Sequence, residues 1–313
     1  MIEVRDLVKA FGRRNPSLAV DNASFSVKRG TVFGLLGPAN AGKTTTLRIL
    51  STTLRPTSGT VEIGGMDILA DTRKVRELMG FAPDLTGLAG WATGEAYLRF
   101  WGKVSGLPKV ERSRRIRDVV NFLELEENIA ASPDTYPVGV VKRLVLAQAL
   151  LTNPQVGIFD EPARGLSASE KVSLAEKLRT LRKEGMTLVL TSQALSDVQS
   201  LCDRIVVMSE GRTTEVQEMS TLLRKIGQGR HGRIFLEADD LTSEATSALE
   251  ALDGVIEIRT TPTTTIIYVE PGRASVEAIR QTIEGQGIVV RSLREAGITL
   301  GDVFRALEGG GQS

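Results

Sequence analysis

The sequence is poor in the two side chains that metal sites and nucleophilic enzymes use most. Its 313 residues contain one cysteine, Cys202, and one histidine, His231. A single cysteine excludes an internal disulfide and any cysteine-rich metal site. A single histidine excludes most histidine-based catalysis, and the glycine-rich surroundings of His231 favour a linker residue over a ligand. Any chemistry must therefore depend on other residue types.

Long apolar runs and an excess of one charge are also missing. No apolar run approaches the ~18 residues of a membrane span, and Glu3 and Asp6 interrupt a start that is unlike a secretory signal. The formal net charge of +1 gives no general attraction to nucleic acid. We interpret the arginines at positions 112, 114, 115 and 117 as the solvated face of a helix. A cytoplasmic protein that does not bind nucleic acid is expected.

The hydrophobic residues, 41% of the chain, are enough for two domains with separate cores. From the start to about residue 225, β-rich runs alternate with helical patterns, which predicts an α/β domain. Strands are expected at 156–159, 187–191 and 204–208, and helices at 92–104, 109–125, 139–151 and 169–184. The first two helices indicate a helical subdomain at about residues 85–152.

The stretch "IGQGRHG", residues 226–232, is rich in glycine and marks a linker between domains. Beyond it, residues 233–313 follow a β-α-β-β-α-β pattern, which is typical of a small α+β ferredoxin-like domain. The stretch "ITLGDVFRALEGG" is expected to close this domain as a short helix. We expect this domain to contact a paired subunit and not to bind the nucleotide.

The stretch "GPANAGKTTT" has the spacing of a loop that binds nucleotide phosphates. It follows an apolar strand and precedes a helical pattern, so that backbone amides, the positive end of a helix and a lysine all face one anion. The predicted nucleotide-binding residues are Gly37, Pro38, Ala39, Asn40, Ala41, Gly42, Lys43, Thr44 and Thr45.

A second chemical element is "PQVGIFDEP", an apolar strand that ends in two carboxylates. Asp160 is expected to hold Mg²⁺ through water, and Glu161 to polarise an attacking water molecule. The alternative is an ordinary acidic strand end.

Together with "YPVGVVKRLVLAQALLTNP", "RGLSASE" and "TLVLTSQALSDVQSLCDRIVVMSEGR", these pieces resemble the ATP-binding subunit of an ABC transporter over residues 1–225. The whole chain resembles the drug-export branch, the daunorubicin-resistance type. The resemblance implies a P-loop ABC-type ATPase fold, with ATP and Mg²⁺ as ligands. It makes Thr44 and Asp160 the Mg²⁺ ligands, Glu161 the general base and Phe11 the ring that stacks on adenine; the alternative for Phe11 is a residue at the edge of the core.

The resemblance also gives the helical subdomain a role, the docking of a coupling helix from a transmembrane partner. Trp91, Tyr97, Phe100 and Trp101 lie in this part of the chain. They contact the partner in one interpretation and belong to the interior in the other, because apolar spacing alone does not separate the two.

The sequence departs from the family pattern at four places. The Ser-Gly-Gly signature is replaced by Pro137, Val138 and Gly139, which removes the serine hydroxyl and one backbone N–H, although Pro137 also suits the start of a helix. The other altered positions are Asp84 for a glutamine, Ser167 for an aspartate and Gln193 for a histidine. Within the phosphate loop, Ala39 and Asn40 are a mild change.

The sequence therefore predicts a cytoplasmic ATP-binding subunit of an exporter, attached to the inner face of the membrane through separate transmembrane chains. Its own hydrolysis is expected to be slow or absent, so its status as an enzyme is open. A heterodimer with a more intact ABC subunit is expected, because a homodimer would contain two impaired sites. The rival hypothesis is an ATP-dependent scaffold or sensor with no role in transport.

Overall fold

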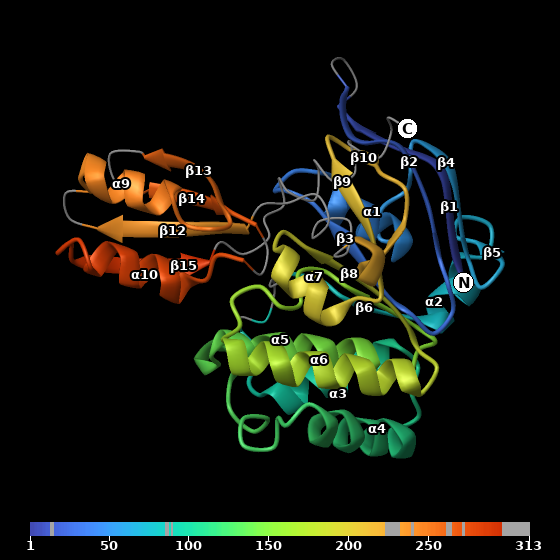
Figure 1. Cartoon of the computed structure of the whole chain (residues 1–313). Coiled ribbons are helices and arrows are strands. Elements are labelled where there is room, and N and C mark those ends of the chain that lie inside the picture. The colour runs from blue at the N-terminus through green and yellow to red at the C-terminus, as the bar shows by residue number, and fades with distance from the viewer. Residues whose placement is uncertain are drawn as a thin grey trace. The chain divides into compact units, whose positions relative to one another are not determined.

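The computed structural model describes residues 1–12, 16–84, 88, 90–222, 232–238, 241–260, 265–270 and 273–295. The chain divides into two compact units, Met1–Ser220 and Thr221–Ser313 (Figure 1). Of the predicted linker, residues 226–232, only Gly232 belongs to the described residues, and His231 lies outside them. The exact domain boundary therefore stays a prediction.

A four-stranded antiparallel sheet forms one layer of the first unit. Its order is β2-β1-β4-β5, from Ser17–Val27, Ile2–Phe11, Ser58–Ile63 and Met66–Asp67. Alternate residues at the start of β1, such as Ile2 and Val4, are buried, whereas Glu3 is only half-buried. This period of two is what a sheet with a single core-facing side produces.

The second layer is a larger sheet whose strands run in the order β10-β9-β3-β8-β7-β6, with β11 also paired to β9. The strands from β9 to β6 are parallel, and every residue of β3, β7 and β8 is buried, as in a sheet covered on both faces. The strands are β3 Val32–Leu36, β6 Met79–Ala82, β7 Val156–Phe159, β8 Thr187–Ser192, β9 Arg204–Ser209, β10 Arg212–Thr213 and β11 Gln217–Glu218.

The main core lies between the two sheets, around helix α1, Lys43–Leu50. Leu47 of α1 is fully buried there, and Phe25 of β2 stacks on Phe33 of β3 with 5.5 Å between the ring centroids. On β3, a Cβ added to Gly34 would lie 2.8 Å from Sγ of Cys202, so glycine makes room for this thiol. Burial raises the pKa of the Cys202 thiol well above its ordinary value.

The other helices of this unit are α2 Thr72–Leu78, α3 Gly94–Val104, α4 Lys109–Phe122, α5 Val138–Leu150, α6 Ala168–Lys183 and α7 Leu195–Leu201, with a 3₁₀ turn at Pro133–Thr135. Helices α3, α4 and α5 pack together as the predicted helical subdomain (Figure 1). None of the helices in the described residues combines the length and apolar character needed to cross a membrane.

The arginine-rich face of α4 is only partly solvated. Arg114 and Arg117 are exposed, as predicted. Arg115 instead donates hydrogen bonds of 2.9 Å to the carbonyl oxygens of Leu150 and Leu151. The prediction was wrong for this residue, because its long side chain reaches the orphan carbonyls at the end of α5.

The aromatic residues of the helical subdomain form one connected cluster. Trp91 contacts both Tyr97 and Phe100, and Trp101 contacts the same two rings, with centroid distances of 5.1–6.2 Å. Tyr97 is buried, whereas Phe100 is 46% exposed. The cluster thus has an interior side and a side that faces solvent, so part of it is core and part is available to a partner.

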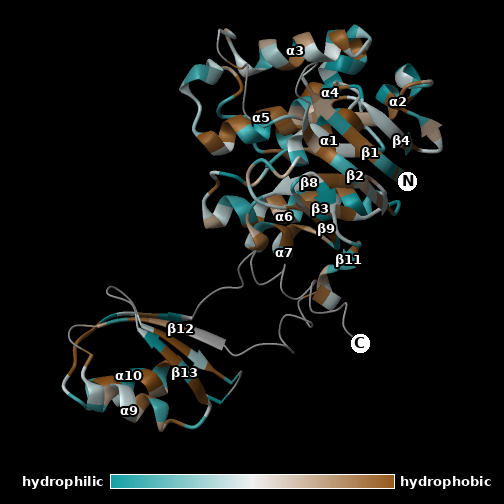
Figure 2. Cartoon of the chain, turned by 90° about the horizontal axis from the view of Figure 1, so that it is seen from above, coloured by the Kyte–Doolittle hydropathy of each residue, from teal (hydrophilic) through white to brown (hydrophobic). Residues whose placement is uncertain are grey.

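The second unit is a four-stranded antiparallel sheet with two helices. Its elements are β12 Gly232–Ala238, α9 Ser243–Glu250, β13 Val255–Thr260, β14 Thr265–Val269, α10 Val276–Glu284 and β15 Val290–Glu295. The sheet order β13-β14-β12-β15 places the first strand in the middle, as in ferredoxin-like folds. Its hydrophobic core joins the sheet to α9 and α10 (Figure 2). The predicted closing helix lies outside the described residues.

Candidate functional site

The phosphate loop connects β3 to α1 and is tightly packed against its surroundings. A Cβ on Gly37 would lie 2.1 Å from the carbonyl oxygen of Met208, and one on Gly42 would lie 2.3 Å from that of Ala19. Gly42 also has φ of +100°, and Asn40 has φ of +63°, a value that asparagine tolerates. Both glycines of the predicted motif are therefore required by close backbone contacts.

Lys43 holds the loop in a curled shape. Its ammonium Nζ donates to the carbonyl oxygens of Gly37 and Pro38, each at 2.8 Å, and lies 3.9 Å from Oε1 of Glu161. Burial lowers the pKa of Lys43, and the nearby carboxylates of Glu161 and Asp160 partly offset this effect. An anion bound at the loop would favour the protonated lysine, because it would replace the lost solvation.

A hydroxyl and a carboxylate meet beside the loop. Oγ1 of Thr44 donates to Oδ1 of Asp160 at 3.2 Å, and Asp160 is only 3% exposed. Oγ1 of Thr191 also donates to this oxygen, at 2.6 Å. One hydroxyl and one carboxylate, from Thr44 and Asp160, are hard oxygen donors that fit Mg²⁺, because this ion keeps most of its ligands as water and phosphate oxygens. Thr191 was not predicted from the sequence, although it lies near the end of β8, the parallel strand beside the one that leads to Asp160.

Glu161 is held in an uncommon backbone conformation, with φ of +47°. Its N–H donates to Oγ1 of Thr191 at 2.8 Å, and its carbonyl oxygen accepts from Nζ of Lys142 at 2.7 Å and from the N–H of Arg164 at 3.2 Å. Oε1 of its carboxylate accepts from Nε2 of Gln193 at 3.1 Å. The surroundings thus fix both the backbone and the carboxylate of the predicted base.

Asp84 is bound to two cations. Oδ1 accepts from Nζ of Lys142 at 2.8 Å, and Oδ2 accepts from the guanidinium of Arg164. Lys142 is 4% exposed, so its charge needs such a partner. From the sequence, Asp84 was interpreted only as a replaced glutamine. Its two cations were not predicted, although Lys142 and Arg164 lie in stretches that resemble the family, because the pairing depends on tertiary contacts.

Several of these groups line a cavity of ≈ 510 Å³. Its lining contains the phosphate loop from Ala39 to Thr45, together with Ser17, Leu18, Ala19, Asp84, Glu161, Arg164 and Gln193. The structure therefore brings most of the predicted site residues to one place. Phe11 is not part of this lining; its ring is 46% exposed and lies 5.1 Å from Nζ of Lys9. Its predicted contact with adenine stays a prediction.

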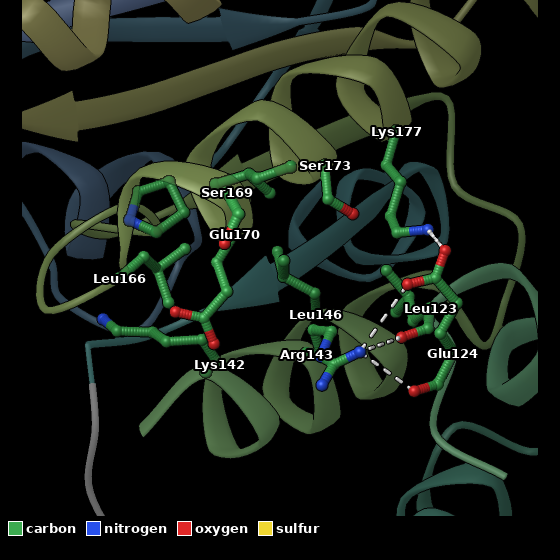
Figure 3. Close-up of a pocket in the computed structure, with 13 residues that line it drawn as sticks. Leu123, Glu124, Lys142, Arg143, Leu146, Leu166, Ser169, Glu170, Ser173 and Lys177 are labelled. Atoms are coloured by element: carbon green, nitrogen blue, oxygen red, sulfur yellow. Dashed lines mark hydrogen bonds and ion pairs between the residues drawn. The ribbon is translucent and has the colours of Figure 1, made fainter. Parts of the chain in front are cut away.

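The altered signature lies at the beginning of α5. Pro137 is the N-cap of this helix, which agrees with its interpretation as a helix-start residue, and Val138 is 45% exposed. A Cβ on Gly139 would lie 1.8 Å from Oε1 of Glu170. In Figure 3, Glu170 points from α6 toward α5, where Gly139 leaves it room.

Ser167 begins helix α6 with a capping box. Its Oγ and its backbone N–H both donate to Oε2 of Glu170, at 2.7 and 2.8 Å, and the N–H of Glu170 donates back to Oγ at 3.4 Å. The donors from Ser167 lower the pKa of Glu170. The S-x-x-E spacing signals this box, but the sequence analysis read Ser167 only as a missing aspartate. The altered loop and the altered signature therefore meet at one carboxylate.

Ser167→Ala should lower the free energy of unfolding by about 1 kcal/mol, because it removes the Oγ hydroxyl that donates to Glu170 and accepts from its N–H. The folded-state pKa of Glu170 lies below its ordinary value. Its contribution is therefore complete above that ordinary value and is lost as the pH falls through the lowered one. Chemical denaturation at pH 7 and at acidic pH measures the difference. Ser173→Ala, on the same helix, serves as the control, and an equal loss in both variants would contradict the prediction.

Comparisons with known proteins place these features in a family. A model of the ABC transporter family matches residues 20–164. The daunorubicin resistance ATP-binding protein DrrA3 of Streptomyces coeruleorubidus is 33% identical over 286 residues, which cover 91% of this chain and 86% of that protein. The chain belongs to the ABC transporter ATP-binding proteins. Its relatives also include the Nod factor export ATP-binding protein I of Ralstonia nicotianae, 34% identical over 68% of this chain and 65% of that protein.

The fold of this ABC protein agrees with solved structures. A dimeric ATP-binding cassette, solved in a post-hydrolysis state with ADP and Pi, aligns with a TM-score of 0.65 and 21% identity over 70% of this chain and 99% of that one. The predicted ABC-type α/β fold is thus confirmed. The family match includes Lys43, Asp160 and Glu161, and it ends at Arg164.

Proposed function

We propose that this ABC protein is the ATP-binding subunit of an exporter complex, which binds Mg-ATP and transmits its binding to separate transmembrane subunits. The observation that carries the proposal is that the phosphate loop, with Lys43 and Thr44, lines one cavity together with Glu161. Asp160 joins this site through the hydrogen bond that it accepts from Thr44. The names of two relatives, for daunorubicin resistance and for Nod factor export, favour export over import. The chain would reach the membrane through its partners, from the cytoplasmic side.

Binding depends on groups that are all in place. The loop amides and the N-terminal end of α1 would bind the phosphates, and the buried charge of Lys43 would add to this attraction. Thr44 and Asp160 would hold Mg²⁺, which neutralises phosphate charge when it is bound. Lys43, Thr44 and Asp160 match the family pattern, and Ala39 and Asn40 are a mild change within the loop.

Slow hydrolysis at this site is the second part of the proposal. The carboxylate of Glu161 already accepts a hydrogen bond from Gln193, whose neutral amide offers no positive charge to the transition state. Pro137 has no N–H to offer, and the exposed side chain of Val138 stands where the family has glycine. A more intact ABC subunit would therefore carry most of the turnover in a heterodimer.

Glu161→Gln in the purified assembly tests whether this site contributes little to the total ATP hydrolysis. We expect total ATP hydrolysis to change little, because this site contributes little of it, and Mg-ATP binding to persist. Steady-state phosphate release measures hydrolysis, and equilibrium nucleotide binding is measured in parallel. Loss of most of the ATPase activity would show that Glu161 works as a base, since loss of such a group costs a large factor in rate.

Purification of the tagged chain from membranes tests the assembly itself. Transmembrane subunits and a second ABC subunit should come with it, in stable stoichiometry by mass spectrometry. A soluble partner alone would favour the rival scaffold or sensor. A complex in which two copies of this chain enclose two ATP molecules, with no second ABC subunit, would contradict the heterodimer.

A further inference from the structure

Two cations share the carboxylate of Asp84, and they differ in their freedom to move. The side chain of Lys142 is 5% exposed, and Nζ is also tied to the carbonyl oxygen of Glu161 at 2.7 Å. The side chain of Arg164 is 54% exposed, and its guanidinium pairs with Asp84. Lys142 is therefore fixed in the interior, whereas Arg164 is held by one ion pair at the surface.

Arg164 lies within reach of the phosphate loop. Its backbone N–H donates to the carbonyl oxygen of Glu161, whose carboxylate is 3.9 Å from Nζ of Lys43. Arg164 also lines the same cavity as Asn40, Lys43 and Thr44. A rotation of its long side chain would move the guanidinium within this cavity without any change in the backbone.

We propose that Arg164 binds the terminal phosphate of a nucleoside triphosphate, and that Asp84 holds its guanidinium while the cavity contains no triphosphate. This inference rests on the proposed binding of ATP in the cavity. The planar fork of a guanidinium suits two phosphate oxygens. When Arg164 leaves, Lys142 still pairs with Asp84, so the carboxylate keeps a partner and the exchange costs less than the loss of a lone ion pair.

The proposal assigns a specific selectivity to Arg164. The loop amides would bind phosphates that ADP and ATP have in common, and Lys43 would reach both a shared phosphate and the terminal one. A guanidinium that binds the terminal phosphate alone would therefore add to the discrimination between the two nucleotides. The altered Asp84 then has a function that the family glutamine, a neutral residue, would not perform. It keeps a cation beside the site and releases it to an incoming negative charge.

The test is equilibrium binding of Mg-ADP and of the Mg complex of the β,γ-imido analogue of ATP to the purified full-length chain. Arg164→Ala should weaken binding of the triphosphate analogue about tenfold, as expected for one charge-assisted contact, with ADP nearly unchanged. The affinity of Arg164→Lys for the triphosphate analogue should lie between those of the wild type and Arg164→Ala. Asp84→Asn should strengthen binding of the triphosphate analogue and not of ADP, because it frees the guanidinium of Arg164.

Arg99→Ala is the matched control. Arg99 has a similarly exposed side chain, at 60%, and pairs with Glu95 on α3 outside the cavity lining. It should leave both affinities unchanged. If Arg164→Ala weakens the binding of both nucleotides equally, or of neither, the inference is wrong although the proposed function stands. A wild-type chain that binds neither nucleotide overturns the proposed function, and the inference with it.

Discussion

Lys43→Ala should weaken Mg-ATP binding by more than about 100-fold, a loss of about 3 kcal/mol. The variant removes a buried positive charge from the phosphate site, and it also removes two hydrogen bonds, to Gly37 and Pro38, that keep the loop curled. Both effects act on binding, the first on the attraction and the second on the shape of the loop. Isothermal titration of the purified chain measures the change.

The control for this variant is a lysine with an exposed ion pair. The side chain of Lys74 on α2 is 70% exposed and pairs with Asp71. Lys74→Ala should therefore leave nucleotide affinity unchanged. Thermal unfolding of both variants separates lost affinity from lost fold. If folded Lys43→Ala binds Mg-ATP within a few-fold of the wild type, the loop is not the phosphate site.

Lys142→Met should lower the free energy of unfolding by about 2 kcal/mol. The methionine keeps much of the side-chain volume, but it removes one of the two donors that the described residues give to the carbonyl oxygen of Glu161; the N–H of Arg164 is the other. It also removes the ion pair of Asp84 with Lys142 and leaves the ion pair with Arg164. Because that cation remains, the loss is smaller than for a fully buried pair that loses one member. Urea denaturation of the nucleotide-free chain measures it.

Lys177→Met is a close control for this prediction. Its side chain is also mostly buried, at 13% exposure, but its partner Glu124 is 62% exposed, so solvent replaces the lost contact. We expect a loss of less than about 1 kcal/mol. Similar losses in the two variants would mean that the contact of Lys142 with the carbonyl oxygen of Glu161 adds no further stability.

The sequence was informative wherever a residue acts through its neighbours in the chain. The phosphate loop, the strand before Asp160 and the helices that became α3 to α6 all follow from local spacing, with ends within a few residues of those observed. Glycine at positions 37 and 42 is part of that local signal, although the atoms that require it, in Met208 and Ala19, are distant in sequence.

The partners of the site residues were not predictable in the same way. Thr191 reaches Asp160 only because β8 lies beside β7, and Lys142 reaches Asp84 only because α5 packs against β6. Such contacts depend on tertiary packing, which a single sequence does not encode in its spacing. For Ser167 the signal was present in the sequence, but comparison with a family pattern directed attention to what was missing instead of to the cap that it forms.

The thiol beneath the central sheet has a practical consequence for spectroscopy. Cys202 is packed against Gly34, and its raised pKa keeps it protonated at neutral pH, so thiol-directed dyes should not react with it in the folded chain. The natural sequence therefore behaves as a cysteine-free background. One cysteine introduced at Val110, which is 85% exposed on α4, would give a singly labelled protein. A dye there would report movements of the helical subdomain when nucleotide binds, with no need to replace the natural residue.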